Sequence, residues 1–279
     1  MLPLIIATLG HAAWDNILHW MIKHDPDVSI LHMHWIRMFF VCLFLSALSF
    51  RKTPTSHTIW WWFKFSICGW VIPTITYTIC VMLSGYRIAI SLQPLIPLFV
   101  ALNVSKMEGM RLIALNFALL GTLTIWLIAP WSHREIFLWK IWGSLLTGGL
   151  QVISIVTWFL MLEKENVLAN ITRGVQMSVF IMFISTIVWT PQHLNAAYMS
   201  GWDNWLGLIV AAAVSSACKL WVIAKCRMSV DSIAIFECLH PIATLCTDIV
   251  FQNEIFEFDD TLAIVLLSIG WILYPKTNI

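Results

Sequence analysis

Long apolar stretches limit the fold of this chain more than any other feature of its sequence. An α-helix needs about 20 consecutive apolar residues to cross the hydrocarbon core of a bilayer. Ten windows of roughly this kind follow one another, at 2–22, 28–50, 59–82, 86–105, 111–130, 139–162, 167–189, 202–224, 230–252 and 261–275. The pattern predicts an all-α integral membrane protein with ten transmembrane helices.

The composition agrees with this prediction and excludes several classes of protein. Of the 279 residues, 59% are hydrophobic and 11% are charged, which is too few charges to cover the surface of a soluble globule. The net charge of +1 offers no basic surface for phosphates, so a nucleic-acid partner is not expected. The seven cysteines lie in or beside apolar stretches without CxxC spacing, which argues against disulfides and structural zinc.

The first window carries ionisable residues at a regular spacing. His11, Asp15 and His19 recur every four residues, and on an α-helix they share an arc of roughly 80°. An Asp at the centre of a spanning helix costs roughly 2.5 to 3.5 kcal/mol. We therefore expect the stripe to face protein or a water-filled cavity, as part of a transport path or proton relay. A structural Asp–His hydrogen-bond pair that fixes helix packing is the alternative.

An even number of windows places both termini on the same side of the membrane. If that side is the cytoplasm, the inside loops and tail hold eight Lys or Arg residues and the outside loops hold four. The positive-inside rule therefore predicts a multi-pass protein of the cell (inner) membrane with both termini cytoplasmic. Within the lipid bilayer we expect a monomer or a homodimer.

The two halves of the sequence are weakly similar to each other. Residues 92–112 and 238–258 each place a Pro early in an apolar helix and a Glu near its end. Five windows per half is an odd number, so the second half would enter the membrane the opposite way up. We expect two inverted five-helix repeats, 1–130 and 131–279, in a single membrane domain.

With this layout the chain resembles the drug/metabolite transporter superfamily, specifically its EamA-like branch of ten-helix transporters. The resemblance rests on an Ala-Ala-Trp-x-Asn run at 12–16, Arg37 in the second window, the Pro-to-Glu fourth and ninth windows, and glycines in the fifth and tenth. Gly109 follows Glu108 where the family usually has a basic residue, and the sixth window lacks the Ala-Trp signature. The resemblance implies helices around a central cavity, alternating access, and export or exchange of small metabolites.

The ninth window repeats the polar pattern of the first. Glu237 and His240 share a face, and Pro241 would loosen the backbone beside them. A carboxylate and an imidazole on each of two helices suit proton coupling if the carboxylate is desolvated. A packing role for Glu237 is the alternative.

Further candidates for substrate binding or coupling lie in the other windows. They are Trp14, His34, Trp35, Arg37, Tyr77, Gln93, Trp158, Arg173, Gln176 and Lys219. Arg37 and Arg173 could clamp a carboxylate or phosphate, or could neutralise buried acids as fixed ion pairs. The sequence leaves both roles open.

Together these features predict a secondary transporter that moves a small polar organic metabolite by alternating access, with proton coupling as an option. An amino-acid-like zwitterion suits the mixed charges best. A cation such as choline or a polyamine, held by Trp14, Trp35 or Trp158, is the alternative. An intramembrane enzyme is the competing class, but the sequence has no H-E-x-x-H, nucleophile elbow or phosphate-binding glycine loop. Neither an enzyme, nor a cofactor, nor a bound metal is therefore expected.

Overall fold

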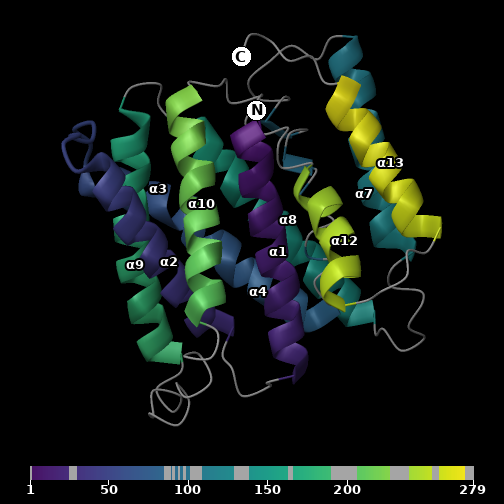
Figure 1. Ribbon diagram of the computed structural model, residues 1–279, viewed down its shortest axis with the longest axis horizontal. Coiled ribbons are helices and arrows are strands. Elements are labelled where there is room, and N and C mark those ends of the chain that lie inside the picture. Colours follow the sequence, from purple (N-terminus) through teal and green to yellow (C-terminus); the bar gives the residue numbers. More distant parts are fainter. Residues whose placement is uncertain are drawn as a thin grey trace.

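The computed structural model is a bundle of helices that run side by side (Figure 1). It describes residues 2–24, 30–84, 89, 92–93, 95–96, 99–100, 109–128, 138–162, 166–189, 206–226, 239–252 and 258–273. Every regular element within these residues is helical. The predicted all-α class therefore holds for the described part of the chain.

The helices coincide with the predicted apolar windows. They are α1 (Leu2–His24), α2 (Ile30–Ser49), α3 (Ile59–Ser66), α4 (Ile72–Ser84), α7 (Met110–Ile128), α8 (Leu138–Leu160), α9 (Val167–Trp189), α10 (Leu206–Cys226), α12 (Leu239–Gln252) and α13 (Phe258–Leu273). A π-helix, η1 (Ile67–Val71), joins α3 to α4, so the third window forms one rod. Most of the predicted window 86–105 lies outside the described residues.

Several helices have the length and composition to cross a membrane. Within the described residues four such spans occur, at Ile59–Val81, Trp142–Leu160, Val167–Ile184 and Leu206–Lys225. Large apolar side chains such as Ile59, Trp142 and Ile272 are exposed on the outside of the bundle. A soluble monomer rarely exposes so much apolar surface, so these features indicate a membrane protein.

The packing order places α1 at the centre of a set of helix pairs. Helix α1 lies against both α10 and α12, α8 lies against α4, and α2 lies against α9 and α10. Helices α7 and α13 pair with each other at one end of the bundle (Figure 1). Their close approach depends on Gly270, because a Cβ there would lie 2.8 Å from the carbonyl oxygen of Ala114.

Polar contacts fix α1 against its two neighbours. Ser215 Oγ on α10 donates a hydrogen bond to the Ala7 carbonyl oxygen at 2.8 Å. On the opposite side, Asn16 Nδ2 donates to the Thr244 carbonyl oxygen at 3.0 Å and also to the Thr247 hydroxyl of α12. These contacts hold the polar stripe of α1 in a defined orientation between α10 and α12.

Candidate functional site

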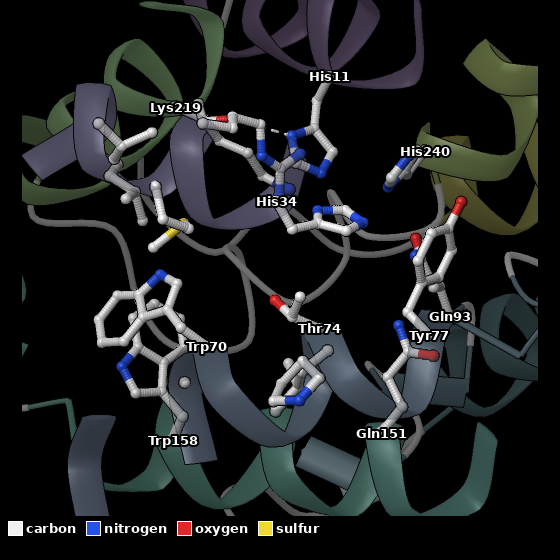
Figure 2. Close-up of a pocket in the computed structure, with 18 of the residues that line it drawn as sticks. His11, His34, Trp70, Thr74, Tyr77, Gln93, Gln151, Trp158, Lys219 and His240 are labelled. Atoms are coloured by element: carbon white, nitrogen blue, oxygen red, sulfur yellow. Dashed lines mark hydrogen bonds between the residues drawn. The ribbon is translucent and has the colours of Figure 1, made fainter. Parts of the chain in front are cut away.

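A cavity of about 180 Å³ lies between α1, α2, α4, α8, α10 and α12. Its two sides differ in chemistry. His11, His34 and His240 lie on one side, and Trp70 and Trp158 on another (Figure 2). The cavity is therefore both ionisable and aromatic, and candidate membrane spans that include α4, α8 and α10 contribute to its walls.

The cavity lining contains a buried acid–base pair from two helices that are far apart in sequence. His240 Nε2 on α12 lies 2.6 Å from Asp15 Oδ2 on α1, and the two side chains are only 3% and 4% exposed. The sequence left open whether the partner of Asp15 would be a basic residue such as Arg37 or an imidazole. The structure gives Asp15 an imidazole partner, which can hold or release a proton at this position.

His11 lies one turn before Asp15 on α1 and is oriented by a chain of hydrogen bonds. Its Nδ1 lies 3.2 Å from Ser216 Oγ, and that hydroxyl donates to the Ala212 carbonyl oxygen at 2.9 Å. The Ser216 hydroxyl donates its proton to the Ala212 carbonyl oxygen. In the contact with His11, Ser216 Oγ therefore accepts, and His11 Nδ1 donates. We assign the Nδ1–H tautomer to His11 on this basis, which leaves a lone pair on Nε2. The His11 and His240 rings meet edge to face at 4.9 Å.

These three residues have the types and spacing of metal ligands. One ligand atom each from His11, Asp15 and His240 lie within 4.8 Å of one another. However, Arg37 and Lys219 line the same cavity. Positive charges near a site disfavour the binding of a divalent cation there.

Arg37 and His34 bring unpaired polar atoms to the cavity from one face of α2. Arg37 is 7% exposed, and among the described residues its Nε and Nη1 atoms have no hydrogen-bond partner. Both ring nitrogens of His34 also lack a partner within this part of the chain. Burial of such groups without partners is costly, so these atoms are suited to bind a polar group in the cavity.

The remaining walls are amide and aromatic. Gln93 and Gln151 each have a side-chain oxygen without a partner. The Trp70 and Trp158 rings meet edge to face at 5.3 Å. The π-helix η1 contributes to this wall, and a Cβ at Gly69 would lie 2.6 Å from Trp158 Cδ1. A single turn of π-helix inside an α-helical rod is frequent at functional sites.

The structure collects most of the predicted site residues on this cavity. Those that line it are His11, Asp15, His34, Arg37, Tyr77, Gln93, Trp158, Lys219 and His240. Trp14 is fully buried, with the Arg37 guanidinium carbon 5.5 Å from its ring centroid. It therefore lies behind the cavity wall and supports Arg37.

Other predicted residues lie elsewhere. Trp35 packs against Phe183 with ring centroids 5.3 Å apart and does not line the cavity. Arg173 and Gln176 are exposed and contact each other, with Nη1 3.5 Å from Oε1. The side chain of His19 and all of Glu237 lie outside the described residues.

Sequence reasoning did not select several residues of the lining, among them Thr74 and Gln151. One signal was present for Gln151. It lies 13 residues after the first residue of α8, Leu138, just as Asp15 lies 13 residues after the first residue of α1, Leu2. A comparison of the two halves by helix position would have selected it.

Comparisons with known proteins show the fold but not the function. No protein-family model matches the chain, and no curated protein matches it in sequence. A solved structure described only as a crystal structure of protein is similar over 98% of this chain and 96% of its own chain, with a TM-score of 0.68 and 15% sequence identity. The bundle is therefore a fold that a solved protein also has.

Proposed function

We propose that the protein is a secondary transporter that binds a small polar organic solute in the central cavity and exposes it to the two sides of a membrane in turn. The observation that carries this proposal is the set of buried, unpartnered polar groups around the cavity, Arg37 and His34 above all. Ionisable residues buried among membrane-spanning helices are expensive and usually mark a substrate or ion pathway.

The helix contacts support two inverted repeats of EamA-like type, 1–130 and 131–279. Helix α1 packs against α10 as α8 packs against α4. Helix α2 packs against α10 as α9 packs against α3, and α7 packs against α13. When each helix is replaced by the corresponding helix of the other half, each of these contacts becomes another contact in the same set. Repeats of this type require such a correspondence. We propose ten spans in this arrangement, with both termini in the cytoplasm as the positive-inside rule predicts.

The Asp15–His240 pair supports coupling to protons. Its atoms are 2.6 Å apart and nearly inaccessible, and His11, Arg37 and Tyr77 interact with one or the other member. A carboxylate and an imidazole at this distance can share, accept or release a proton as the cavity changes its access. We propose that protonation of this pair accompanies each transport cycle.

Two alternatives receive less support. A cationic solute such as choline would meet the positive charges of Arg37 and Lys219, and the Trp14 ring already faces Arg37. An enzyme would need a nucleophile beside its base or an open metal site. Within the described lining, the hydroxyl closest to such an arrangement is Ser216, and its proton is donated to a backbone carbonyl.

Flux in proteoliposomes tests the proposal. Purified protein is reconstituted with a pH-sensitive dye inside, and organic anions, amino acids and amines are added outside. We expect a solute to be taken up with saturation and to move protons, and Asp15→Asn to abolish the proton movement. Absence of saturable flux for all three classes, with the protein correctly inserted, would contradict the proposal.

The orientation has a test of its own. Reporter domains fused after Ile279 and within 253–260 are expected to lie in the cytoplasm and outside the cell, respectively. If the reporter in 253–260 lies in the cytoplasm, the assignment of both the orientation and the inverted repeat fails.

A further inference from the structure

The charges that line the cavity are unequal. Among the lining residues that the structure describes, Asp15 is the acidic one, and Arg37 and Lys219 are both cationic. Asp15 is already paired with His240. Arg37 makes no ion pair within the described residues and keeps two nitrogens without a hydrogen bond. None of the described residues thus supplies a carboxylate that hydrogen-bonds Arg37, and a negative group in the cavity could take this place.

We propose that the cavity binds an organic anion with a single carboxylate and an apolar body, rather than a zwitterion or a cation. The inference rests on the proposed function, since the bound anion is taken to be the transported solute. Arg37 and His34 would hold the carboxylate. Trp70 and Trp158 would contact the apolar body.

Arg37 is placed to hold a carboxylate in a fixed orientation. Its planar guanidinium presents paired N–H donors that match the two oxygens of a carboxylate. The Trp14 ring, 5.5 Å from the guanidinium carbon, supports it through a cation–π contact. His34 lies three residues earlier on the same face of α2 and lines the same cavity. The His34 ring points into the cavity beside His11 (Figure 2), so an imidazole N–H can add a further donor.

The far side of the cavity accepts an apolar group. The Trp158 ring lies 5.3 Å from Trp70 and 5.0 Å from Phe159, so the three rings form a continuous aromatic surface on the lining. The unpartnered oxygens of Gln93 and Gln151 would repel a second carboxylate but can accept a hydrogen bond from a hydroxyl or N–H group. These features favour a monoanion over a dianion.

An ammonium group has no comparable place. The charged acceptor available to it is Asp15, whose Oδ2 lies 2.6 Å from His240. An ammonium group would have to displace the imidazole and approach Arg37 and Lys219. The charge of the cavity therefore discriminates against amino acids and amines even where their shape fits.

Three probes of one shape test the inference: 3-phenylpropanoate, phenylalanine and 2-phenylethylammonium. Binding to the purified full-length protein in detergent is measured by isothermal titration calorimetry, with acetate as a fourth probe. We expect 3-phenylpropanoate to bind at least about tenfold more tightly than phenylalanine or acetate, and the ammonium compound not to bind. Equal or tighter binding of phenylalanine or the ammonium compound would overturn the inference. Acetate binding as tightly as 3-phenylpropanoate would also overturn it, because the aromatic surface would then contribute nothing.

Two arginine variants test the role of Arg37. Arg37→Gln is expected to weaken 3-phenylpropanoate binding at least about 30-fold. Arg173→Gln removes the exposed arginine of the other half and is expected to change the affinity less than about twofold. Unchanged affinity in a folded Arg37→Gln protein would refute the assigned role. If that variant does not fold, the affinity of Arg37→Lys for 3-phenylpropanoate and the wild-type probe series still test the role of Arg37.

Binding and flux together separate this inference from the proposed function. If 3-phenylpropanoate binds as expected but crosses proteoliposome membranes no faster than in empty vesicles, the transport proposal fails and the anion site stands. If the protein transports an amino acid or an amine but does not bind the anion, the transport proposal stands and the anion site fails.

Discussion

Asp15 and Gln151 occupy the same position in two helices of equal length, yet one is an acid and the other an amide. Each lies 13 residues after the first residue of its 23-residue helix, and each lines the cavity. Their neighbours differ in the same way. His240 and Gln93 each stand between a Leu and a Pro, in the runs 239–241 and 92–94. Each pair thus combines one residue from each half: Asp15 on α1 meets His240 on α12, whereas the corresponding positions, Gln151 on α8 and Gln93, are two amides.

The difference teaches how two corresponding residue pairs, each with one member from each half, can have different roles in one cavity. Carboxylate and imidazole side chains exchange protons, whereas an amide donates and accepts hydrogen bonds without changing its charge. We infer that the Asp15–His240 pair accepts and releases protons and that the Gln93–Gln151 pair contacts the solute. The two arginines diverge similarly, because Arg37 is buried at the cavity and Arg173 is exposed.

The largest expected effect follows from removing the acid. Asp15→Asn makes this position an amide, as in the other half, and a proton-transfer group in place is worth about 100-fold or more. We expect proton-coupled flux to fall by about that factor and the residual flux to lose its dependence on pH. Flux in proteoliposomes at several pH values measures both quantities.

The same variant also separates a functional from a purely structural role for Asp15. The Asn side chain keeps the shape and a hydrogen-bonding oxygen beside His240, so we expect a loss of stability of only about 1 to 3 kcal/mol. Melting temperature is measured on the preparation used for flux. A stable Asp15→Asn protein with wild-type flux and pH dependence would remove the difference that we assign to the two residue pairs.

The second prediction concerns the aromatic wall, which carries no charge. Gly69→Ala would place a Cβ 2.6 Å from Trp158 Cδ1, so the indole must move. Overpacking of this kind costs about 1 to 3 kcal/mol. We expect a lower melting temperature and weaker binding of 3-phenylpropanoate, with unchanged pH dependence of flux.

Gly149→Ala is the matched control for Gly69→Ala. No atom lies within 4 Å of a Cβ at Gly149 on α8, and Ala is a better helix former than Gly. Melting temperature should therefore stay constant or rise slightly. A shift in pH dependence with Gly69→Ala alone would show that the aromatic wall and the acid–base pair do not act separately.

The third prediction tests the amide pair directly. Gln93→Met and Gln151→Met keep the approximate shape of the side chain and remove the amide. Loss of one neutral hydrogen bond, about 0.5 to 1.5 kcal/mol, corresponds to about a 2- to 13-fold loss of affinity. We expect weaker binding of a hydroxylated anion, such as 3-(4-hydroxyphenyl)propanoate, with pH dependence retained. Loss of proton coupling in either variant would contradict the separate roles of the two residue pairs.

Much of the local structure could be predicted from the sequence, because length and apolar composition determine where membrane helices form. The windows matched the helices of the described residues, and the four-residue spacing placed His11 and Asp15 together on the cavity side of α1. The partner of Asp15 could not be predicted, since His240 is 225 positions away and its approach depends on how α1 packs against α12.

Burial also depends on packing that no local pattern reveals. Arg37 and Arg173 occupy similar places in their windows, yet only Arg37 reaches the cavity. Trp35 was a reasonable aromatic candidate beside His34, but the α2 helix turns its ring toward Phe183. Identical residue types at comparable positions thus acquired different surroundings because their neighbouring helices differ.

The smallest expected effect concerns the contact between α1 and α12, the two helices that carry Asp15 and His240. Asn16 donates to the Thr244 carbonyl oxygen and to the Thr247 hydroxyl, and the same position of α8 is the apolar Val152. Asn16→Val would therefore give both halves an apolar side chain at this position. Hydrogen bonds between membrane helices average about 0.6 kcal/mol and reach about 1.7 kcal/mol. We expect a loss of stability in that range.

A double-mutant cycle assigns this loss to the contact between the helices. Thr247→Val removes the hydroxyl but leaves the Thr244 carbonyl as an acceptor for Asn16, so its effect should be smaller than that of Asn16→Val. The combined variant should lose less than the sum of the two single changes, because both remove the same hydrogen bond. Stability is measured by unfolding in detergent, and proton-coupled flux is measured in parallel. Strict additivity would show that Asn16 acts through its own packing, whereas a large loss of proton coupling would show that the Asp15–His240 distance depends on this contact.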